Sequence, residues 1–206
     1  MRIITIGREF GSGGREVGKR LADALGIAYY DREIITEIAK HSELDEHYVE
    51  HVLESGMPHG VFLTFGQTLS AASIVGIHPA TSVLSAQKKV IEKLAEKDCV
   101  IVGRCADVIL ADKNPFKIFV YADEKSKLKR CRERTPEDEE LSDKKLLKKM
   151  RKIDKGRAKL HDLFLGGEWG NRGEYNLCVN TSGTIVKEVV PCIADYVNHW
   201  FENQEK

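Results

Sequence analysis

A glycine-rich segment near the start of the chain carries the residue types that bind phosphate. It reads Gly7-Arg8-Glu9-Phe10-Gly11-Ser12-Gly13-Gly14-Arg15. It follows the apolar run 2–6, and the apolar residues after it recur at helical spacing, which predicts a connection from a strand to a helix. Backbone N–H groups at a helix N-terminus lack partners within the helix, and glycines let the chain approach an anion closely. The segment therefore predicts a phosphate site, although an ordinary glycine-rich turn is the alternative.

The segment departs from the phosphate-loop pattern G-x-x-x-x-G-K-[ST] at its charged position. With Gly13 as the second glycine, Gly14 occupies the place of the lysine and Arg15 the place of the hydroxyl residue. The first glycine then falls on Arg8, unless one residue is inserted and Gly7 is used. Either Arg15 or Arg8 must therefore supply the positive charge that the lysine normally brings.

Arginines and polar residues also follow the other strand-like runs of the chain. Arg104 comes directly after one of them, where its planar fork suits a phosphate monoester, although a salt bridge capping the next helix is the alternative. Asp31 is a good helix N-cap and could also touch an acceptor or a water on Mg²⁺. Its neighbour Arg32 is a candidate phosphate contact. We expect these side chains near one edge of the sheet, because ligands bind at the carboxyl ends of parallel strands.

A basic stretch at residues 123–159 stands out from a chain of zero net charge. It holds fifteen Lys or Arg against nine Asp or Glu. Such a run is often a solvated helical face. Placed over a phosphate site, it would act as a closing lid, because phosphoryl transfer depends on positioning and charge neutralisation. We favour the lid, in which Arg151 and Lys155 share one face and Asp154 and Arg157 lie three residues apart.

The elements that must position these residues alternate along the 206-residue chain. Strands are expected at 2–6, 28–30, 99–102, 117–121 and 177–179. Helical patterns are found at about 14–25, 31–41, 44–54, 83–96, 104–111, 124–134, 139–159 and 184–202. This order predicts one α/β domain in which a parallel sheet is covered by helices on both faces. Residues 55–82 have poor periodicity and are expected to contain a loop and one or two helices.

Composition excludes several classes of protein. A net charge of zero argues against general nucleic-acid binding. Five scattered cysteines without C-x-x-C spacing indicate neither a disulfide framework nor a zinc site. The apolar runs are too short to cross a membrane, and the start of the chain does not resemble a signal peptide, so we expect a cytoplasmic protein. Nothing in the sequence indicates an oligomeric state.

Five segments together carry a resemblance to a known family. They are Ile6–Arg15, Tyr30–Glu33, Val100–Asp107, Ile153–Arg157 and Tyr175–Ser182. Over nearly its whole length the chain resembles the cytidylate-kinase-like branch of the P-loop nucleoside monophosphate kinases. The resemblance implies a three-layer fold with a five-stranded parallel sheet, an acceptor-binding excursion at 42–82 and a helical lid at 124–165. It also implies Mg²⁺-dependent transfer of the ATP γ-phosphoryl group.

The resemblance, together with the residue patterns described above, assigns roles to individual positions of this sequence. The donor phosphates would be held by Gly11, Ser12, Gly13, Gly14 and Arg15, the adenine would lie beside Asn180, Thr181 and Ser182, and Ser12 would lie near the Mg²⁺ shell. The acceptor would be bound by Asp31, Arg32, Arg104, Asp154 and Arg157. The catalytic charges would come from Arg15, Arg104, Arg151 and Arg157.

Two further departures from the family pattern affect these assignments. Met150 holds the place of the first lid arginine, with Arg151 one residue late, and Cys105 stands where cytidylate kinases have an aspartate. The second departure weakens the argument for cytosine specificity. We expect a single kinase domain over 1–206 that phosphorylates a nucleoside monophosphate, CMP or dCMP, with ATP and Mg²⁺. The alternatives are a kinase for another small acceptor and a nucleotide-binding sensor of little catalytic power.

Overall fold

The computed structural model contains one five-stranded parallel sheet, as the sequence predicts. It describes residues 1–55, 71–134, 141–164 and 167–204. The strands are β1 (Ile3–Arg8), β2 (Ala28–Tyr30), β3 (Cys99–Val102), β4 (Phe116–Tyr121) and β5 (Leu177–Asn180). Their order is β2-β3-β1-β4-β5, and every pair is parallel. Because β1 is central, the glycine-rich segment that follows it lies between the ends of β3 and β4.

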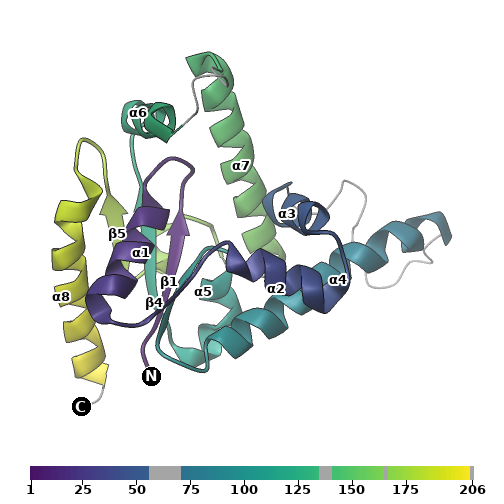
Figure 1. Ribbon diagram of the computed structural model, residues 1–206, viewed down its shortest axis with the longest axis horizontal. Helices are drawn as coiled ribbons and strands as arrows, with labels where there is room; N and C mark the ends of the chain where they lie inside the picture. The colour runs from purple at the N-terminus through teal and green to yellow at the C-terminus, as the bar shows by residue number, and fades with distance from the viewer. Residues whose placement is uncertain (56–70, 135–140, 165–166, 205–206) are drawn as a thin grey trace.

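Helices cover both faces of this sheet (Figure 1). They are α1 (Gly14–Leu25), α2 (Glu33–Ser42), α3 (Glu46–Ser55), α4 (Ala71–Leu94), α5 (Ala106–Ile109), α6 (Glu124–Arg134), α7 (Asp143–Leu163) and α8 (Val186–Gln204). Short 3₁₀ helices span Ala111–Lys113 and Arg172–Glu174. No helix of the described ranges is both long and apolar enough to span a membrane.

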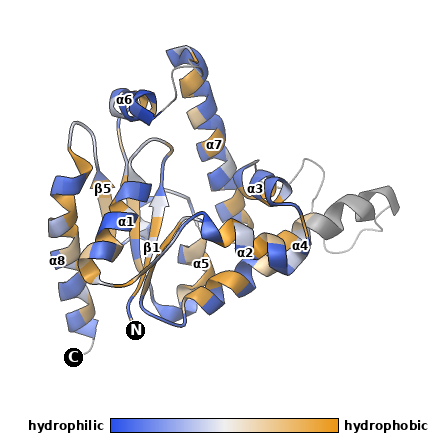
Figure 2. Ribbon diagram, viewed as in Figure 1, coloured by the Kyte–Doolittle hydropathy of each residue, from blue (hydrophilic) through white to orange (hydrophobic). Residues whose placement is uncertain are grey.

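Two apolar clusters, one on each face, fix the sheet between its helices. Ile4 and Ile6 of β1 point to the side covered by α1 and α8. Ile3 points to the opposite side, where α2, α3, α4 and α5 pack. All four residues of β3 are buried, as expected for a parallel strand covered on both faces. Figure 2 shows the apolar stripes of α1 and α8, whereas α7 is largely hydrophilic.

The structure places some elements differently from the sequence prediction. Helix α4 begins at Ala71 rather than near 83, and part of the expected excursion at 42–82 lies outside the described residues. The long basic helix runs over Asp143–Leu163 rather than 139–159. The N-cap prediction for Asp31 is wrong. The capping position of α2 is Arg32, without a side-chain cap, and the Asp31 carboxylate forms ion pairs instead.

Candidate functional site

The glycine-rich segment forms a loop whose backbone conformation requires glycine at two positions. Gly11 and Gly13 have φ angles of +77° and +84°, in the left-handed region that other residues rarely adopt. A Cβ at Gly13 would also lie 2.9 Å from Cγ2 of Val186. Gly13 is the capping residue of α1. The loop therefore presents the N-terminus of a 12-residue helix, which favours anions.

Ser12 holds the loop against the end of β5. Its hydroxyl, which is fully buried, donates a 2.8 Å hydrogen bond to the carbonyl of Glu9. Its own carbonyl accepts a 2.6 Å hydrogen bond from Oγ1 of Thr181. The Arg130 guanidinium donates to the Ser12 and Thr181 carbonyls. Because its hydroxyl is engaged inside the loop, the place of Ser12 in a Mg²⁺ shell stays a prediction.

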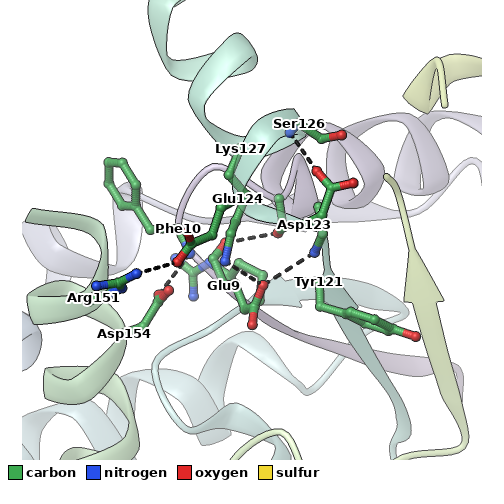
Figure 3. Close-up of polar contacts among 12 residues, drawn as sticks. Glu9, Phe10, Tyr121, Asp123, Glu124, Ser126, Lys127, Arg151 and Asp154 are labelled. Atoms are coloured by element: carbon green, nitrogen blue, oxygen red, sulfur yellow. Dashed lines mark hydrogen bonds and ion pairs between the residues drawn. The ribbon is translucent and has the colours of Figure 1, made fainter. Parts of the chain in front are cut away.

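Glu9 ties the loop to the start of α6. Its carboxylate accepts hydrogen bonds from Nζ of Lys127 at 2.9 Å and from the backbone N–H of Ala122 at 3.2 Å (Figure 3). The Lys127 side chain is only 12% exposed, so this ion pair is better protected from solvent than a surface pair. Neither residue stands out in the sequence as a functional candidate.

The predicted lid helix α7 contacts the loop through Asp154 and Arg157. Oδ1 of Asp154 accepts a 2.8 Å hydrogen bond from the backbone N–H of Phe10 (Figure 3). Arg157 donates to Asp154 at 3.2 Å and to the Arg8 carbonyl at 3.1 Å. Its guanidinium also lies over the Phe10 ring, 5.9 Å from the centroid, within cation–π range. Burial raises the pKa of Asp154 despite the nearby charge of Arg157.

Arg151, the other lid arginine of the prediction, points elsewhere. Its guanidinium lies 2.6 Å from the Glu124 carboxylate of α6, and its side chain is 71% exposed (Figure 3). Arg32 is similarly exposed and pairs with Glu50 of α3 at 3.5 Å. These two predicted residues therefore lie in surface ion pairs, whereas Asp154 and Arg157 are at the loop.

Four arginines gather at the carboxyl ends of the central strands: Arg8, Arg15, Arg104 and Arg157. They surround Asp31, which is 4% exposed and forms ion pairs with Arg15 and, at 3.8 Å, with Arg8. Burial lowers the pKa of Arg8 well below its usual value, and the charges of Arg157 and Arg104 lower it further. A phosphate bound here would relieve the repulsion among these cations.

The turn after β3 holds Arg104 in an unusual backbone conformation. Gly103, Arg104 and Cys105 have φ angles of +72°, +59° and +53°. The Gln87 side chain supports the turn by donating a 2.6 Å hydrogen bond to the Arg104 carbonyl. The Arg104 Nε is buried and has no hydrogen-bond partner in the part of the chain that the structure describes. Such strain and such unpaired donors are typical of binding sites.

Two cavities meet at this cluster. The larger measures about 330 Å³ and lies over the loop, with a lining that includes Gly11, Gly13, Arg15, Arg130 and Lys149. The smaller measures about 30 Å³ and is lined by residues including Leu53, Arg104, Asp107, His161 and Trp169. Arg8, Glu54 and Arg157 line both. These three residues therefore mark the boundary between the two cavities.

A buried pair that the sequence analysis missed lies at the smaller cavity. Nε2 of His161 on α7 is 3.0 Å from Oδ2 of Asp107 on α5, and Nδ1 is 3.3 Å from the Gly167 carbonyl. Burial lowers the pKa of His161, but the hydrogen bond and charge of Asp107 outweigh it, so the pKa is raised overall. Both ring nitrogens face oxygen acceptors, which favours the imidazolium form.

The remaining predicted residues lie at the end of β5. Thr181 is buried and its hydroxyl also contacts the Tyr121 carbonyl at 3.2 Å. Oδ1 of Asn180 accepts hydrogen bonds from the backbone N–H and hydroxyl of Ser182. The structure thus joins the end of β5 to the loop through Thr181 and Ser12, and the place of Asn180, Thr181 and Ser182 beside a nucleotide stays a prediction.

Comparison with known proteins identifies the family and the fold of the chain. Residues 3–183 match the model of the cytidylate kinase-like family, and the chain belongs to that family. Among curated proteins, none matches the chain. The solved structure of an uncharacterized protein from Eubacterium ventriosum has 29% sequence identity and a TM-score of 0.68, with 96% of this chain and 99% of that chain covered.

Two shikimate kinases share the fold at lower identity. The enzyme from Bacteroides thetaiotaomicron has 14% identity and a TM-score of 0.56, covering 96% of this chain and 98% of its own. The enzyme from Acinetobacter baumannii, in complex with shikimate, has 15% identity and a TM-score of 0.53, covering 100% and 95%. The chain therefore has the α/β fold of the P-loop kinases, and its family is that of kinase-like phosphotransferases.

Proposed function

We propose that this protein transfers the γ-phosphoryl group of ATP to the phosphate of a nucleoside monophosphate, CMP or dCMP. One observation carries the proposal. Arg8 and Arg157 lie at the boundary between a larger cavity over the phosphate loop and a smaller cavity that contains Arg104. A phosphoryl group that passes from donor to acceptor would cross this boundary, where positive charge stabilises it most.

The larger cavity suits the donor. The backbone amides of Gly11, Ser12, Gly13 and Gly14 and the side chain of Arg15 would hold its phosphates, with the adenine near Asn180 and Thr181. Among the described residues, no three acidic, histidine or cysteine side chains gather into a metal-ligand group. This fits Mg²⁺ held mainly by phosphates and water, as is usual for this ion, with Ser12 nearest in the loop. Bound there, Mg²⁺ would neutralise phosphate charge.

The smaller cavity suits the acceptor phosphate. Arg104 offers a buried Nε that has no hydrogen-bond partner among the described residues, and Arg157 reaches the same cavity from α7. Asp154 orients Arg157 through their 3.2 Å contact, while Asp31 and Arg32 lie on the β2 side of the site. The acceptor phosphate is already anionic at neutral pH, so this reaction demands no general base. Arg151 would contribute only after the outer part of α7 moves toward the cavity.

A second function has one observation in its favour. Oδ1 of Asp31 is buried and accepts no hydrogen bond from any described residue. A hydroxyl on a small acceptor could donate to it, and Asp31 would then act as the general base. The shikimate kinases that share the fold are named for an acceptor that carries hydroxyl groups. A kinase for a small hydroxyl-bearing acceptor is therefore the second candidate function.

An acceptor screen separates the two functions. ADP release from ATP·Mg²⁺ would be followed with CMP, dCMP, UMP, AMP, GMP, shikimate and small sugars, and each phosphorylated product would be identified by mass. Turnover with CMP or dCMP that is lowered but not abolished in Asp31→Asn supports the nucleotide kinase. Turnover with an alcohol, abolished in Asp31→Asn, supports the second function. ATP binding without turnover of any acceptor contradicts both and favours a sensor.

A further inference from the structure

We propose that Arg8 provides the phosphate-loop cation, so that the positive charge has moved from the end of the loop to its beginning. The inference rests on the proposed function for its ligand, the terminal phosphates of ATP. It concerns two positions of the pattern G-x-x-x-x-G-K at once. The first glycine is replaced by Arg8, and the lysine is replaced by Gly14.

The two exchanged positions face each other in space. A Cβ at Gly14 would lie 2.5 Å from Cβ of Arg8 and 3.0 Å from its Cγ. Real Cβ atoms do not approach other atoms so closely, and the base of the Arg8 side chain cannot swing away as its tip could. Only one of the two positions can therefore carry a side chain. In this chain the side chain stands at position 8, so the lysine of the pattern has no room at position 14.

A second glycine accommodates the other end of the same side chain. A Cβ at Gly103 would overlap Nη1 of Arg8 and lie 2.5 Å from its Cζ. The side chain therefore starts beside the first turn of α1 and ends over the turn after β3. Gly14 and Gly103, which are 89 positions apart in the sequence, both leave room for this one arginine.

The guanidinium is well placed to meet a phosphate. Arg8 lines both cavities, and its side chain is 11% exposed. Its ion pair with Asp31 spans 3.8 Å, which is longer than a hydrogen bond, so a phosphate oxygen would offer a closer partner. The main chain of Arg8 is fixed as well, because its carbonyl accepts from Arg157.

Arg15, the other arginine of the loop, is less suited to this role. Its side chain is 55% exposed and forms a short ion pair with Asp31. It also lines an open surface pocket with Glu16 and Arg20. Arg15 therefore lies at the rim of the site, whereas Arg8 lies in its interior.

An exchange of side chains tests the proposal. Calorimetry would measure ATP·Mg²⁺ binding, and ADP release would measure turnover, in Arg8→Gln, Arg8→Lys, Arg8→Gly and the double variant Arg8→Gly/Gly14→Lys. The Arg8→Gln variant should still fold, because glutamine keeps most of the side-chain volume. We expect its ATP binding to be about 10- to 100-fold weaker, which is the range for the loss of hydrogen bonds to a charged group. Arg8→Lys should lose less. The double variant should regain most of the affinity that Arg8→Gly loses.

The results separate this inference from the proposed function. Wild-type affinity in Arg8→Gln, or a double variant no better than Arg8→Gly, overturns the role of Arg8 whatever the acceptor turns out to be. Weaker ATP binding in Arg8→Gln and recovery in the double variant support it, even if the wild type phosphorylates no acceptor in the screen. In that last case the proposed function fails and the role of Arg8 in nucleotide binding stands.

Discussion

Backbone strain at single residues is concentrated where the proposed acceptor phosphate binds. Gly103, Arg104 and Cys105 all have φ angles between +53° and +72°. Left-handed conformations of this kind cost on the order of 1–3 kcal/mol each for residues other than glycine. The turn keeps Arg104 over the end of β3, and Gly103 makes room for Arg8. Glycine is therefore required at position 103 for two reasons, because the backbone has a positive φ angle and because a Cβ would overlap the Arg8 guanidinium.

A pair of glycine variants separates these requirements. Gly26 has a φ of +64°, and no described heavy atom lies within 4 Å of a Cβ placed there. We expect Gly26→Ala to lower the free energy of unfolding by about 1 kcal/mol and to leave turnover unchanged. Gly103→Ala should cost more stability and reduce ATP binding and turnover at least tenfold, because it displaces the Arg8 guanidinium. Urea denaturation measures the stability of each variant, and ADP release measures its turnover. Equal losses of stability and of turnover in the two variants would contradict a role of Gly103 in placing Arg8.

The two lid arginines allow another comparison. Arg157 is at the boundary of both cavities, whereas Arg151 is in an exposed pair with Glu124. We expect Arg157→Ala to lower kcat about 100-fold, which corresponds to about 2.7 kcal/mol of transition-state stabilisation. Arg151→Ala should cost less than tenfold. A larger loss in Arg151→Ala would show that α7 moves inward during the reaction.

The positions of the candidate site residues are predictable where they depend on local pattern, and the roles of these residues stay predictions. The loop glycines, Arg104 after β3 and the Asp154–Arg157 pair all lie where the pattern placed them. Arg8 was considered only as a substitute charge, and the Glu9–Lys127 contact was missed. Such contacts join residues more than a hundred positions apart, and no local spacing encodes them. The proximity of Gly14 and Gly103 to Arg8 likewise emerges only from the folded chain.

At the scale of elements, α7 packs against α3, with Leu160 in the apolar core, and two polar contacts help to fix its orientation. Its middle contacts the phosphate loop through Asp154, and its last turn contacts α5 through His161 and Asp107. The second contact lies beside the smaller cavity. Orientation of α7, and hence of Arg157, therefore depends on a buried ionic hydrogen bond.

This contact predicts a pH dependence of stability. The pKa of His161 is raised in the folded protein above the unfolded value of about 6.5, so its contribution is fully present below that pH and is lost as pH rises through the folded pKa. We expect His161→Gln to cost about 1.5–3 kcal/mol at pH 6 and less at pH 9. Urea denaturation across this range measures the difference. A penalty independent of pH would show that His161 acts by packing alone.

Element boundaries were predicted well where apolar periodicity is strong. The five strands were located within two residues of their observed ends, because each is a short apolar run in a buried parallel sheet. The helix α4 begins at Ala71 rather than near 83, so its start was missed by about three turns. Gly, Ser and Thr in the stretch before 83 obscure its helical period. Asp31 was predicted to cap α2 because aspartate is a favoured N-cap residue and lies just before this helix. Its carboxylate instead forms ion pairs with Arg8 and Arg15.

At the scale of the whole molecule, zero net charge conceals an uneven distribution. Positive charge gathers over the carboxyl edge of the sheet, from Arg8 and Arg104 beneath to Arg130 and Lys149 above. A ligand that binds only the folded state raises its stability by an amount set by its concentration relative to Kd. A polyphosphate should therefore stabilise the entire domain.

Thermal unfolding with nucleotides tests this expectation. At ATP·Mg²⁺ concentrations 100 times Kd, the gain of about 2.7 kcal/mol corresponds to a rise in Tm of about 5–10 °C for a domain of this size. We expect Arg104→Ala to keep this rise, because Arg104 lies on the acceptor side. Adenosine, which lacks phosphates, should give little shift. If adenosine raised Tm as much as ATP·Mg²⁺ does, the binding energy would come from contacts outside the phosphate loop.

The most direct measurement is formation of CDP and ADP from CMP and ATP·Mg²⁺ by the wild type and by Arg104→Ala, side by side. The account predicts equal amounts of the two products in the wild type. It predicts a loss of about 100-fold in kcat/KM for CMP in the variant, with ATP binding retained, because Arg104 holds the acceptor phosphate. An unchanged rate in Arg104→Ala would contradict the central assignment of the acceptor site.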